Sequence, residues 1–221
     1  MSDKKSVLKT IKDDDIAYVD LRFCDPRGKL QHVTVVSDLV DEDFLDEGMM
    51  FDGSSIAGWK GIEESDMKLI VDVESAYIDP FFAEKTLCVH CSVVEPDTNE
   101  PYSRDPRGTA EKAEAYLISS GVGDQAFMGP EAEFFLFDDV RYSNTPNKVS
   151  FQIDAVDAAW NTDTEYEMGN TGHRAAHKGG YFPVNPIDAG QDLRGEMLTT
   201  MKRMGMRTDK HHHEVASGQH E

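Results

Sequence analysis

A proline-containing stretch divides the sequence of 221 residues into two regions with different patterns. Pro96, Pro101 and Pro106 fall among polar residues, which is typical of a linker because proline interrupts regular structure. The region before this stretch contains short apolar runs typical of strands, and the region after it mixes helical and strand patterns. We therefore predict an α+β protein with a small domain at 14–100 and a second domain at 105–221.

Strand patterns dominate the first region. They occur at 16–23, 30–36, 68–74 and 86–94. The turn sequence Asp-Pro-Arg-Gly at 25–28 predicts a hairpin between the first two strands, because proline suits its second position and glycine its fourth. We expect Ser37 to begin a short acidic helix that runs through Glu47 and ends at Gly48.

Two helices are predicted in the second region. Asp105 and Pro106 have the sequence of a helix start, and that helix should end near Gly121. A second helix is expected from about Asp188 to Met204. Its apolar stripe, which we interpret as core packing rather than a cofactor contact, consists of Leu193, Met197, Met201 and Met204.

Composition limits the classes of partner and location. The net charge of −20 argues against nucleic acid and anionic membranes, because no basic stripe offsets it. The sequence shows no signal peptide and no apolar run near the roughly 18 residues of a membrane span. Three cysteines without a secretion signal predict reduced thiols and a cytoplasmic protein. Cys88 and Cys91 would face opposite ways on a strand, which favours core thiols over a zinc site.

The run from Gly129 to Phe137 places two carboxylates two residues apart at the head of an apolar segment. On a strand, Glu131 and Glu133 would project from the same face of a rigid, largely buried element. Like charges this close repel, and a hard divalent cation such as Mg²⁺ or Mn²⁺ is the simplest compensation. The alternative is a solvent-facing strand edge with two exposed acids.

A second acidic cluster lies between His211 and Glu221. Glu214 and Glu221 flank a Ser-Gly turn and could converge, so that Glu133 would complete a cage of carboxylates for a hard cation. The three consecutive histidines cannot all bind one ion, because neighbours on a strand alternate faces. Each histidine alone also fits an ordinary polar role.

Two glycine-containing segments have loop chemistry. Asp-Gly-Ser-Ser at 52–55 sets a carboxylate beside two hydroxyls, and Gly-Gly at 179–180 permits a close approach of the main chain to a ligand. Ordinary turns explain both segments equally well, and neither is a Walker-type phosphate loop.

Taken in order, these segments resemble the motifs of bacterial type I glutamine synthetases. The resemblance rests on 51–55 with 64–67, 129–135, 178–183 and 212–221, and the segments 78–82 and 104–107 fit as well. The match spans nearly the whole chain. It implies a β-grasp N-terminal domain followed by the first part of an α+β catalytic domain.

The resemblance also implies a reaction and a set of site residues. The reaction is ligation of ammonium to glutamate with ATP, through a γ-glutamyl phosphate. Two divalent ions, Mg²⁺ or Mn²⁺, would serve it. The implied first-metal ligands are Glu133, Glu214 and Glu221. Glu131 would join the second metal and the nucleotide site, and Asp209 stands where the family often has a nucleotide-contacting glutamate, which leaves that contact open.

For ammonium, the resemblance implies Asp52 with Ser55, Tyr181 and Glu214. Asp52 would bind ammonium and take its proton, reaching into the site of a neighbouring subunit. The family assembles as a dodecamer of two stacked hexameric rings, so a homo-oligomer is expected. Family catalytic domains continue beyond residue 221, so we expect this chain to be a fragment without synthetase activity of its own. The alternatives are a glutamate–polyamine ligase of the same superfamily and a non-catalytic short chain that joins full-length subunits.

Overall fold

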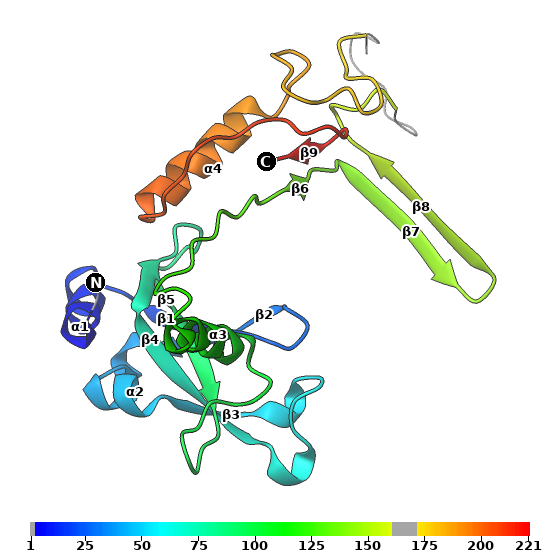
Figure 1. The fold of residues 1–221 in the computed structure, drawn as a ribbon. Coiled ribbons are helices and arrows are strands. Elements are labelled where there is room, and N and C mark those ends of the chain that lie inside the picture. The colour runs from blue at the N-terminus through cyan, green and yellow to red at the C-terminus, as the bar shows by residue number, and fades with distance from the viewer. Residues whose placement is uncertain (1–2, 161–171) are drawn as a thin grey trace. The chain divides into compact units, whose positions relative to one another are not determined.

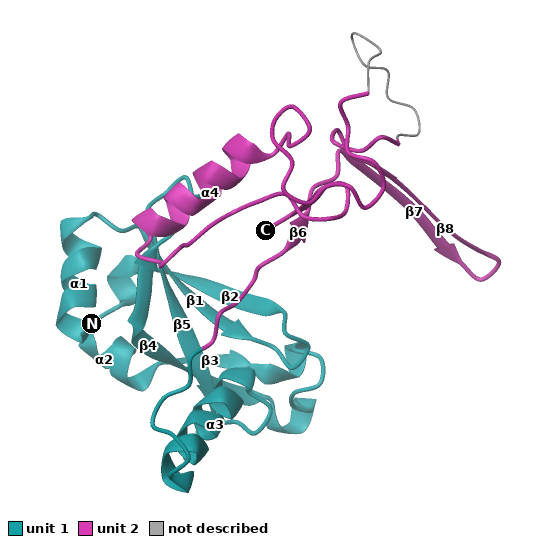
Figure 2. Cartoon of the chain, turned by 45° about the horizontal axis from the view of Figure 1, so that its top comes forward, with its two compact units in different colours: residues 1–127 teal, residues 128–221 magenta. Residues whose placement is uncertain are grey.

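The computed structural model describes residues 3–160 and 172–221, and the chain forms two compact units. The first unit is Met1–Phe127 and the second is Met128–Glu221 (Figure 2). The helix α3 (Pro106–Ser120) belongs to the first unit. The predicted division between domains at 100–105 therefore stays a prediction, distinct from this division into compact units.

A five-stranded sheet forms the first unit (Figure 1). Its strands are β1 (Tyr18–Cys24), β2 (Leu30–Val36), β3 (Met49–Asp52), β4 (Asp66–Ile78) and β5 (Thr86–Val94), in the order β2-β1-β5-β4-β3. The β1 and β5 strands are parallel, and the other neighbours are antiparallel. The strands predicted at 30–36 and 86–94 are confirmed to the residue. The predicted turn is also confirmed, and Asp25 accepts hydrogen bonds there from the main-chain N–H groups of Arg27 and Lys29.

Two short helices precede β3 in the first unit. α1 (Lys4–Asp13) begins with a capping box in which Asp3 and Ser6 each bind the other's main-chain N–H. α2 (Glu42–Glu47) ends at Gly48, as predicted, but it begins at Asp41 rather than Ser37. The expectation for Ser37 was wrong because Asp41 caps the N–H of Phe44, whereas 37–39 form a separate 3₁₀ turn, as 53–55 and 62–64 also do.

The predicted helix start at Asp105 is confirmed. The Asp105 carboxylate accepts the N–H of Arg107, Pro106 takes the first position of α3, and Gly121 ends the helix at a φ of 71°. The same carboxylate also accepts the N–H of Val93 in β5 at 3.0 Å, and it is fully buried. Asp105 therefore fixes α3 to the sheet as well as capping it.

Alternation along the strands separates two layers of side chains. One face of the sheet packs into the hydrophobic core, for which β1 supplies Val19, Leu21 and Phe23. The cysteines follow the same rule, since Cys91 lies in this core whereas Cys88 shares the opposite face with Asp20. Both thiols are buried and free, and burial raises the pKa of each to about 12. Their interpretation as core thiols is confirmed.

The opposite face carries a buried polar network centred on Asp20. Its carboxylate accepts hydrogen bonds from Arg22 at 2.8 Å and Thr34 at 2.6 Å, and it lies 2.7 Å from the Nδ1 of His32. Burial alone would raise the pKa of Asp20, but these hydrogen bonds and the neighbouring cations lower it overall. The network satisfies a charge that the fold has removed from water.

Among its described residues, the second unit contains short strands and one long helix. They are β6 (Phe134–Phe135), β7 (Asp139–Thr145), β8 (Lys148–Asp154), α4 (Gln191–Arg203) and β9 (Gln219–His220). β6 pairs with β9, and β7 pairs with β8, both antiparallel. Within the described residues, each helix is too short or too polar to cross a lipid bilayer.

Two expectations for the second unit are wrong. The strand predicted to carry Glu131 and Glu133 is reduced to two paired residues, because its partner β9 is equally short, and both glutamates precede it as exposed residues. The helix predicted from Asp188 is confirmed as α4. However, the stripe expected to pack in a core is half exposed, at 43% for Leu193 and 39% for Met197.

Candidate functional site

A tight hairpin over residues 212–221 carries several of the predicted ligands. His212 and Glu221 exchange two main-chain hydrogen bonds of 3.0 Å, and the N–H of Glu214 donates to the carbonyl of Gln219 at 2.8 Å. Opposed pairs therefore run 212 with 221, 213 with 220 and 214 with 219. Because side chains alternate, residues 212, 214, 219 and 221 share one face, and residues 213 and 220 share the other.

The first face gathers His212, Glu214 and Glu221. The Nε2 of His212 lies 3.2 Å from a carboxylate oxygen of Glu221, and its Nδ1 lies 3.6 Å from one of Glu214. One ligand atom from each residue lies within 4.8 Å of the other two, and the three side chains are 12–16% exposed. This cluster is the candidate metal site.

Glu133 is connected to the same face by Gln219. The side-chain amide of Gln219 donates to the carboxylate of Glu133 at 2.7 Å. Since Phe134 pairs with His220, extending the register by one residue sets Glu133 opposite Glu221. Of the three carboxylates implied as first-metal ligands, Glu214 and Glu221 thus meet on one hairpin face, and Glu133 is linked to that face through Gln219.

The opposite face of the hairpin holds a second group of metal-ligand types. His213, His220 and Asp157 bring ligand atoms within 4.8 Å of one another, and all three are buried. Here, however, the Nε2 of His213 lies 2.7 Å from Asp157, and an Arg194 nitrogen lies 2.7 Å from the Nδ1 of His220.

That second group is better explained as a hydrogen-bond network than as an ion site. Arg194 is buried, forms an ion pair with Asp188 and donates a hydrogen bond to His220. A permanently charged guanidinium therefore already lies beside this group of residues. Burial, together with His213 and Arg194, lowers the pKa of His220, so this ring is neutral and accepts the arginine proton. The network anchors the back of the hairpin that presents Glu214 and Glu221.

The Gly-Gly segment lies along the hairpin. The N–H of Gly180 donates to the carbonyl of Val215, and the Nδ1 of His213 donates to the carbonyl of Gly180 at 2.8 Å. A Cβ on Gly180 would lie 2.5 Å from the carbonyl oxygen of Glu214, so only glycine fits. The close approach was expected toward a ligand, whereas among the described residues Gly180 makes it to the hairpin's own main chain. Tyr181 follows directly, with its ring 5.6 Å from that of His212.

The residues implied for the nucleotide line one cavity. Glu131 and Asp209 both contribute to a cavity of about 490 Å³ within the second unit. The α4 residues Met197 and Met201 contribute apolar wall to it. Two residues of the stripe that was expected to be core thus line this cavity. The cations Arg207 and Lys210 are also part of its lining.

In the first unit, the Asp-Gly-Ser-Ser loop is organised around the carboxylate of Asp52. It accepts the hydroxyl and the N–H of Ser54 at 2.6 and 2.9 Å, and the hydroxyl of Ser55 at 3.0 Å. The hydrogen bonds from Ser54, followed by that from Ser55, lower the pKa of Asp52. The loop thus keeps this carboxylate ionised, which favours binding a cation over accepting a proton.

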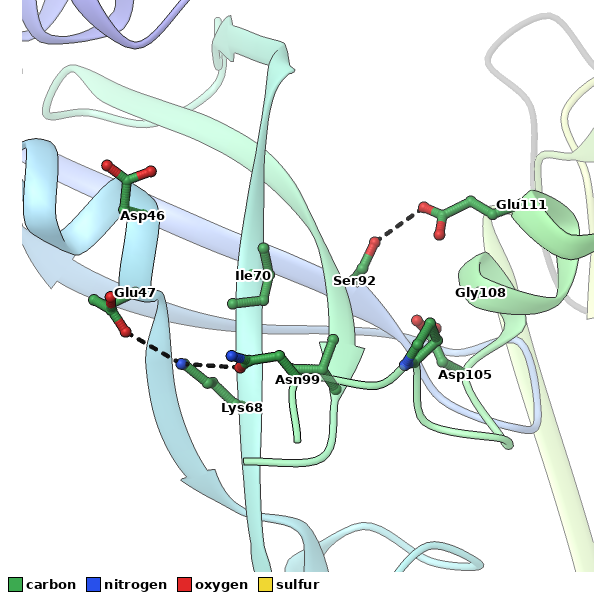
Figure 3. A pocket seen from close by; sticks show the side chains of 11 residues that line it. Asp46, Glu47, Lys68, Ile70, Ser92, Asn99, Asp105, Gly108 and Glu111 are labelled. Atoms are coloured by element: carbon green, nitrogen blue, oxygen red, sulfur yellow. Dashed lines mark hydrogen bonds and ion pairs between the residues drawn. The ribbon is translucent and has the colours of Figure 1, made fainter. Parts of the chain in front are cut away.

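A second cavity, of about 340 Å³, lies in the first unit (Figure 3). Its lining mixes acidic, polar and apolar residues, and its lysine, Lys68, pairs with Glu47 at 3.5 Å and donates to Asn99 at 3.2 Å. On the other side Ser92 donates to Glu111 of α3. These hydrogen bonds and ion pairs link the sheet to α2 and α3, which explains the polar side chains that line this cavity.

Sequence reasoning passed over three residues of these sites. The motifs at 51–55 and 212–221 contain Ser54 and Gln219 but predict no role for them, although each hydrogen bonds a predicted carboxylate. The sequence pattern also does not distinguish His212 from the neighbouring histidines. The alternation of faces across a hairpin was the available signal, since it separates His212 from His213 and groups it with Glu214.

The chain thus consists of a unit built on a mixed sheet and a second unit. In the second unit, a hairpin brings carboxylates and an imidazole together as a candidate cation site. The family model described as the glutamine synthetase β-grasp domain matches residues 15–96, and that of the glutamine synthetase catalytic domain matches residues 103–221. The chain belongs to the glutamine synthetase family.

Individual relatives agree with this assignment. The chain is 75% identical over all its 221 residues to "Glutamine synthetase" of Cereibacter sphaeroides, covering 47% of that protein. It is 52% identical over 216 residues to "Glutamine synthetase" of Escherichia coli strain K12, covering 97% of this chain and 46% of that protein. The chain thus spans about half the length of the curated relatives it matches.

Solved structures support the fold. The electron cryomicroscopy structure of Plasmodium falciparum glutamine synthetase superposes with a TM-score of 0.85 at 21% identity, covering 100% of this chain and 43% of that one. A structure titled "GmaS/ADP complex-Conformation 1" gives a TM-score of 0.69 at 17% identity, again over 100% of this chain and 43% of the other. At these identities the likeness bears on the fold alone.

Proposed function

We propose that this chain forms the β-grasp domain and the first part of the catalytic domain of a glutamate–ammonia ligase. The longer protein would join ammonium to L-glutamate with ATP through a γ-glutamyl phosphate, in the cytoplasm and as a homo-oligomer. Family membership supports the reaction class. The observation that carries the proposal is the hairpin face where Glu214 and Glu221 meet His212, with Glu133 tied to it through Gln219.

This donor set fits a divalent cation such as Mg²⁺ or Mn²⁺. Carboxylate oxygens are the ligands that hard cations prefer, and Glu133, Glu214 and Glu221 would hold the first ion. Glu131 would join the second. When bound, such ions neutralise phosphate charge during phosphoryl transfer.

The chain's own residues would do the rest of the positioning. Glu131 and Asp209 line the cavity of the second unit, whose apolar wall and cations suit a nucleotide's base and phosphates. Tyr181, beside His212, would line an ammonium pocket with Glu214. Asp52, held ionised by Ser54 and Ser55, would attract ammonium into the site of a neighbouring subunit. A lowered pKa makes it a better electrostatic partner than a proton acceptor.

A chimeric enzyme tests this proposal. The chain would replace the matching 221 residues of the Cereibacter sphaeroides relative, to which it is 75% identical. We expect the purified chimera to form glutamine from glutamate, ammonium and ATP. Glu214→Gln or Glu221→Gln should abolish that activity, whereas Asp124→Asn, at an exposed position in the first unit, should not. A folded chimera whose activity survives Glu214→Gln would overturn the proposed site.

The same chimera separates the alternatives. If a diamine or another polyamine outcompeted ammonium, the glutamate–polyamine ligase would replace the glutamine synthetase. The 221 residues expressed alone are proposed to be inactive. If they nevertheless co-purified with a co-expressed full-length relative and altered its activity, the interacting short chain would become the better description.

A further inference from the structure

We propose that Arg194 of α4 is a positioning residue of the proposed active site, because it fixes a wall that the nucleotide cavity shares with the cation hairpin. The inference rests on the proposed function, since it concerns the same two sites. It adds a residue that acts on both sites through its neighbours. Its consequence is that the affinities for the metal ion and for the nucleotide depend together on one buried guanidinium.

The guanidinium of Arg194 connects three separate segments of the second unit. One terminal nitrogen donates to Asp188, ahead of α4, at 2.5 Å. The Nε lies 3.2 Å from the Nδ1 of His211, which precedes the hairpin, and the other terminal nitrogen lies 2.7 Å from the Nδ1 of His220, on the returning strand. A planar guanidinium offers its donors in fixed directions, so it sets the positions of these three segments relative to one another.

The surroundings of this side chain leave no free space. Arg194 is 2% exposed, and a Cβ on Gly190, where α4 begins, would lie 2.6 Å from one of its terminal nitrogens. The same Cβ would lie 2.7 Å from the ring of His220, so only glycine leaves room for the guanidinium between the helix and the hairpin. Because a buried charge is costly without its partners, a shift of one segment requires a shift of the others.

The cavity and the hairpin meet at this arginine. Arg194 contributes to the lining of the cavity of about 490 Å³, and so do His211 and Glu221. Glu221 is also one of the proposed cation ligands, and it directly follows His220 in the chain. The contact that holds His220 therefore also fixes the place of Glu221 between the nucleotide cavity and the cation.

Weakening this support should affect both sites. We expect Arg194→Ala to raise the half-saturating Mg²⁺ concentration of the chimeric enzyme by about tenfold or more, the usual scale for residues that orient metal ligands. The KM for ATP should rise with it. Arg194→Lys keeps the charge but loses the planar fork, so it should restore little. Gly190→Ala should act in the same direction, because its methyl group displaces the guanidinium without removing it.

Chemical rescue in the chimera tests the inference. Arg194→Ala leaves a gap of guanidinium size on the wall of the cavity, through which a free guanidinium ion can enter. We expect millimolar guanidinium chloride, at concentrations that leave the enzyme folded, to lower both constants of Arg194→Ala toward their unaltered values. Sodium chloride at equal ionic strength should have no such effect. Arg203→Ala is the matched control, because Arg203 is an exposed arginine of the same helix outside the cavity lining, and it should keep both constants unaltered.

A purely structural role of Arg194 predicts a different result. The variants would then lose thermal stability, but their folded fraction would keep the unaltered half-saturating Mg²⁺ concentration and KM for ATP, and the inference would be overturned. A rise in only one of the two constants would overturn it as well, because the wall would not be shared. If Arg194→Ala does not fold, Arg194→Lys and Gly190→Ala decide by the same two constants.

The failure of this inference is distinguishable from the failure of the proposed function. An active chimera that requires Glu214, but whose two constants do not respond to changes at Arg194 and Gly190, contradicts the inference alone. A folded chimera that is inactive, or whose activity survives Glu214→Gln, contradicts the proposed function, and the inference falls with it.

Discussion

At the scale of single residues, Asp52 and Asp20 differ in the groups that donate hydrogen bonds to their carboxylates. Asp52 is fully hydrogen bonded by Ser54 and Ser55 at the surface, whereas Asp20 is buried with cations around it. The pKa of each carboxylate is lowered. For Asp20 the largest single effect is burial, which opposes this shift, whereas for Asp52 the largest effect is the hydrogen bonding from Ser54. The consequence for Asp52 is a carboxylate that stays charged.

We predict that Ser54→Ala raises the pKa of Asp52 toward its ordinary value, because Ser54 supplies the largest stabilisation of the charged form. Since the folded pKa lies below the unfolded one, the stability gained from these bonds is present above about pH 4 and is lost as the pH falls further. Carboxyl ¹³C NMR titration measures the shift. Ser119→Ala, which removes only a bond to the Tyr116 carbonyl, is the control. Matching Asp52 titrations in the two variants would contradict the prediction.

At the scale of elements, the helix-capping residues make different numbers of contacts with the rest of the fold. Asp41 caps α2 at the surface, whereas Asp105 caps α3 and also binds the N–H of Val93 from a fully buried position. The sequence signal for the two caps is alike, so it could predict the helix starts but not this difference.

We therefore predict unequal costs for the two cap deletions. Asp41→Ala should lower the free energy of unfolding by about 1 kcal/mol. Asp105→Ala should lower it by about 2–4 kcal/mol, because it also leaves the buried N–H of Val93 without a partner. Urea unfolding followed by tryptophan fluorescence, to which the core residue Trp59 contributes, measures both. Equal costs would show that the bond between Asp105 and the sheet contributes nothing.

The contact between Gly180 and the hairpin yields a further prediction. Gly180→Ala would press a methyl group against the Glu214 carbonyl and the His213 ring, so we expect a loss of roughly 1–3 kcal/mol and weaker Mn²⁺ binding. Gly129→Ala is the control in the same unit, because nothing lies within 4 Å of its Cβ position. Urea unfolding and Mn²⁺ titration check both variants. Wild-type behaviour in Gly180→Ala would contradict the packing described here.

At the scale of the whole molecule, the two units differ in how they bury apolar surface. The described hydrophobic core draws on the first unit, from Val7 to Tyr102. The second unit has buried alanines and a buried ionic network instead, and its β7–β8 hairpin exposes Tyr142 and Phe151. A two-stranded hairpin with exposed faces has little stability of its own.

Hydrogen exchange should report this difference. We predict that amides of β1, β4 and β5 exchange much more slowly than those of β7 and β8, because strands with partners on both sides and a core beneath them open least often. Mass spectrometry of exchanging peptides from the intact chain measures it. Equal protection in the two groups would mean that the hairpin is stabilised by contacts beyond those described.

The sequence predicted local features better than features that depend on distant partners. β2, β5, the turn at 25–28 and α3 follow from alternation, turn residues and caps, which are local signals. The extent of the Glu131–Glu133 segment could not be predicted, because strand pairing depends on a partner, β9, far along the chain. The motifs identified most site carboxylates, but not Gln219 or His212, whose roles arise only when the hairpin closes.

The two-sided hairpin also limits how the chain can change in length. An extra residue between 212 and 213 would exchange the faces of the residues after it, turning His213 toward the carboxylates while burying Glu214. An extra residue within the turn at 215–218 leaves both faces in place. Among homologous chains, insertions and deletions in this segment should therefore concentrate in the turn, where they alter its length without altering its chemistry.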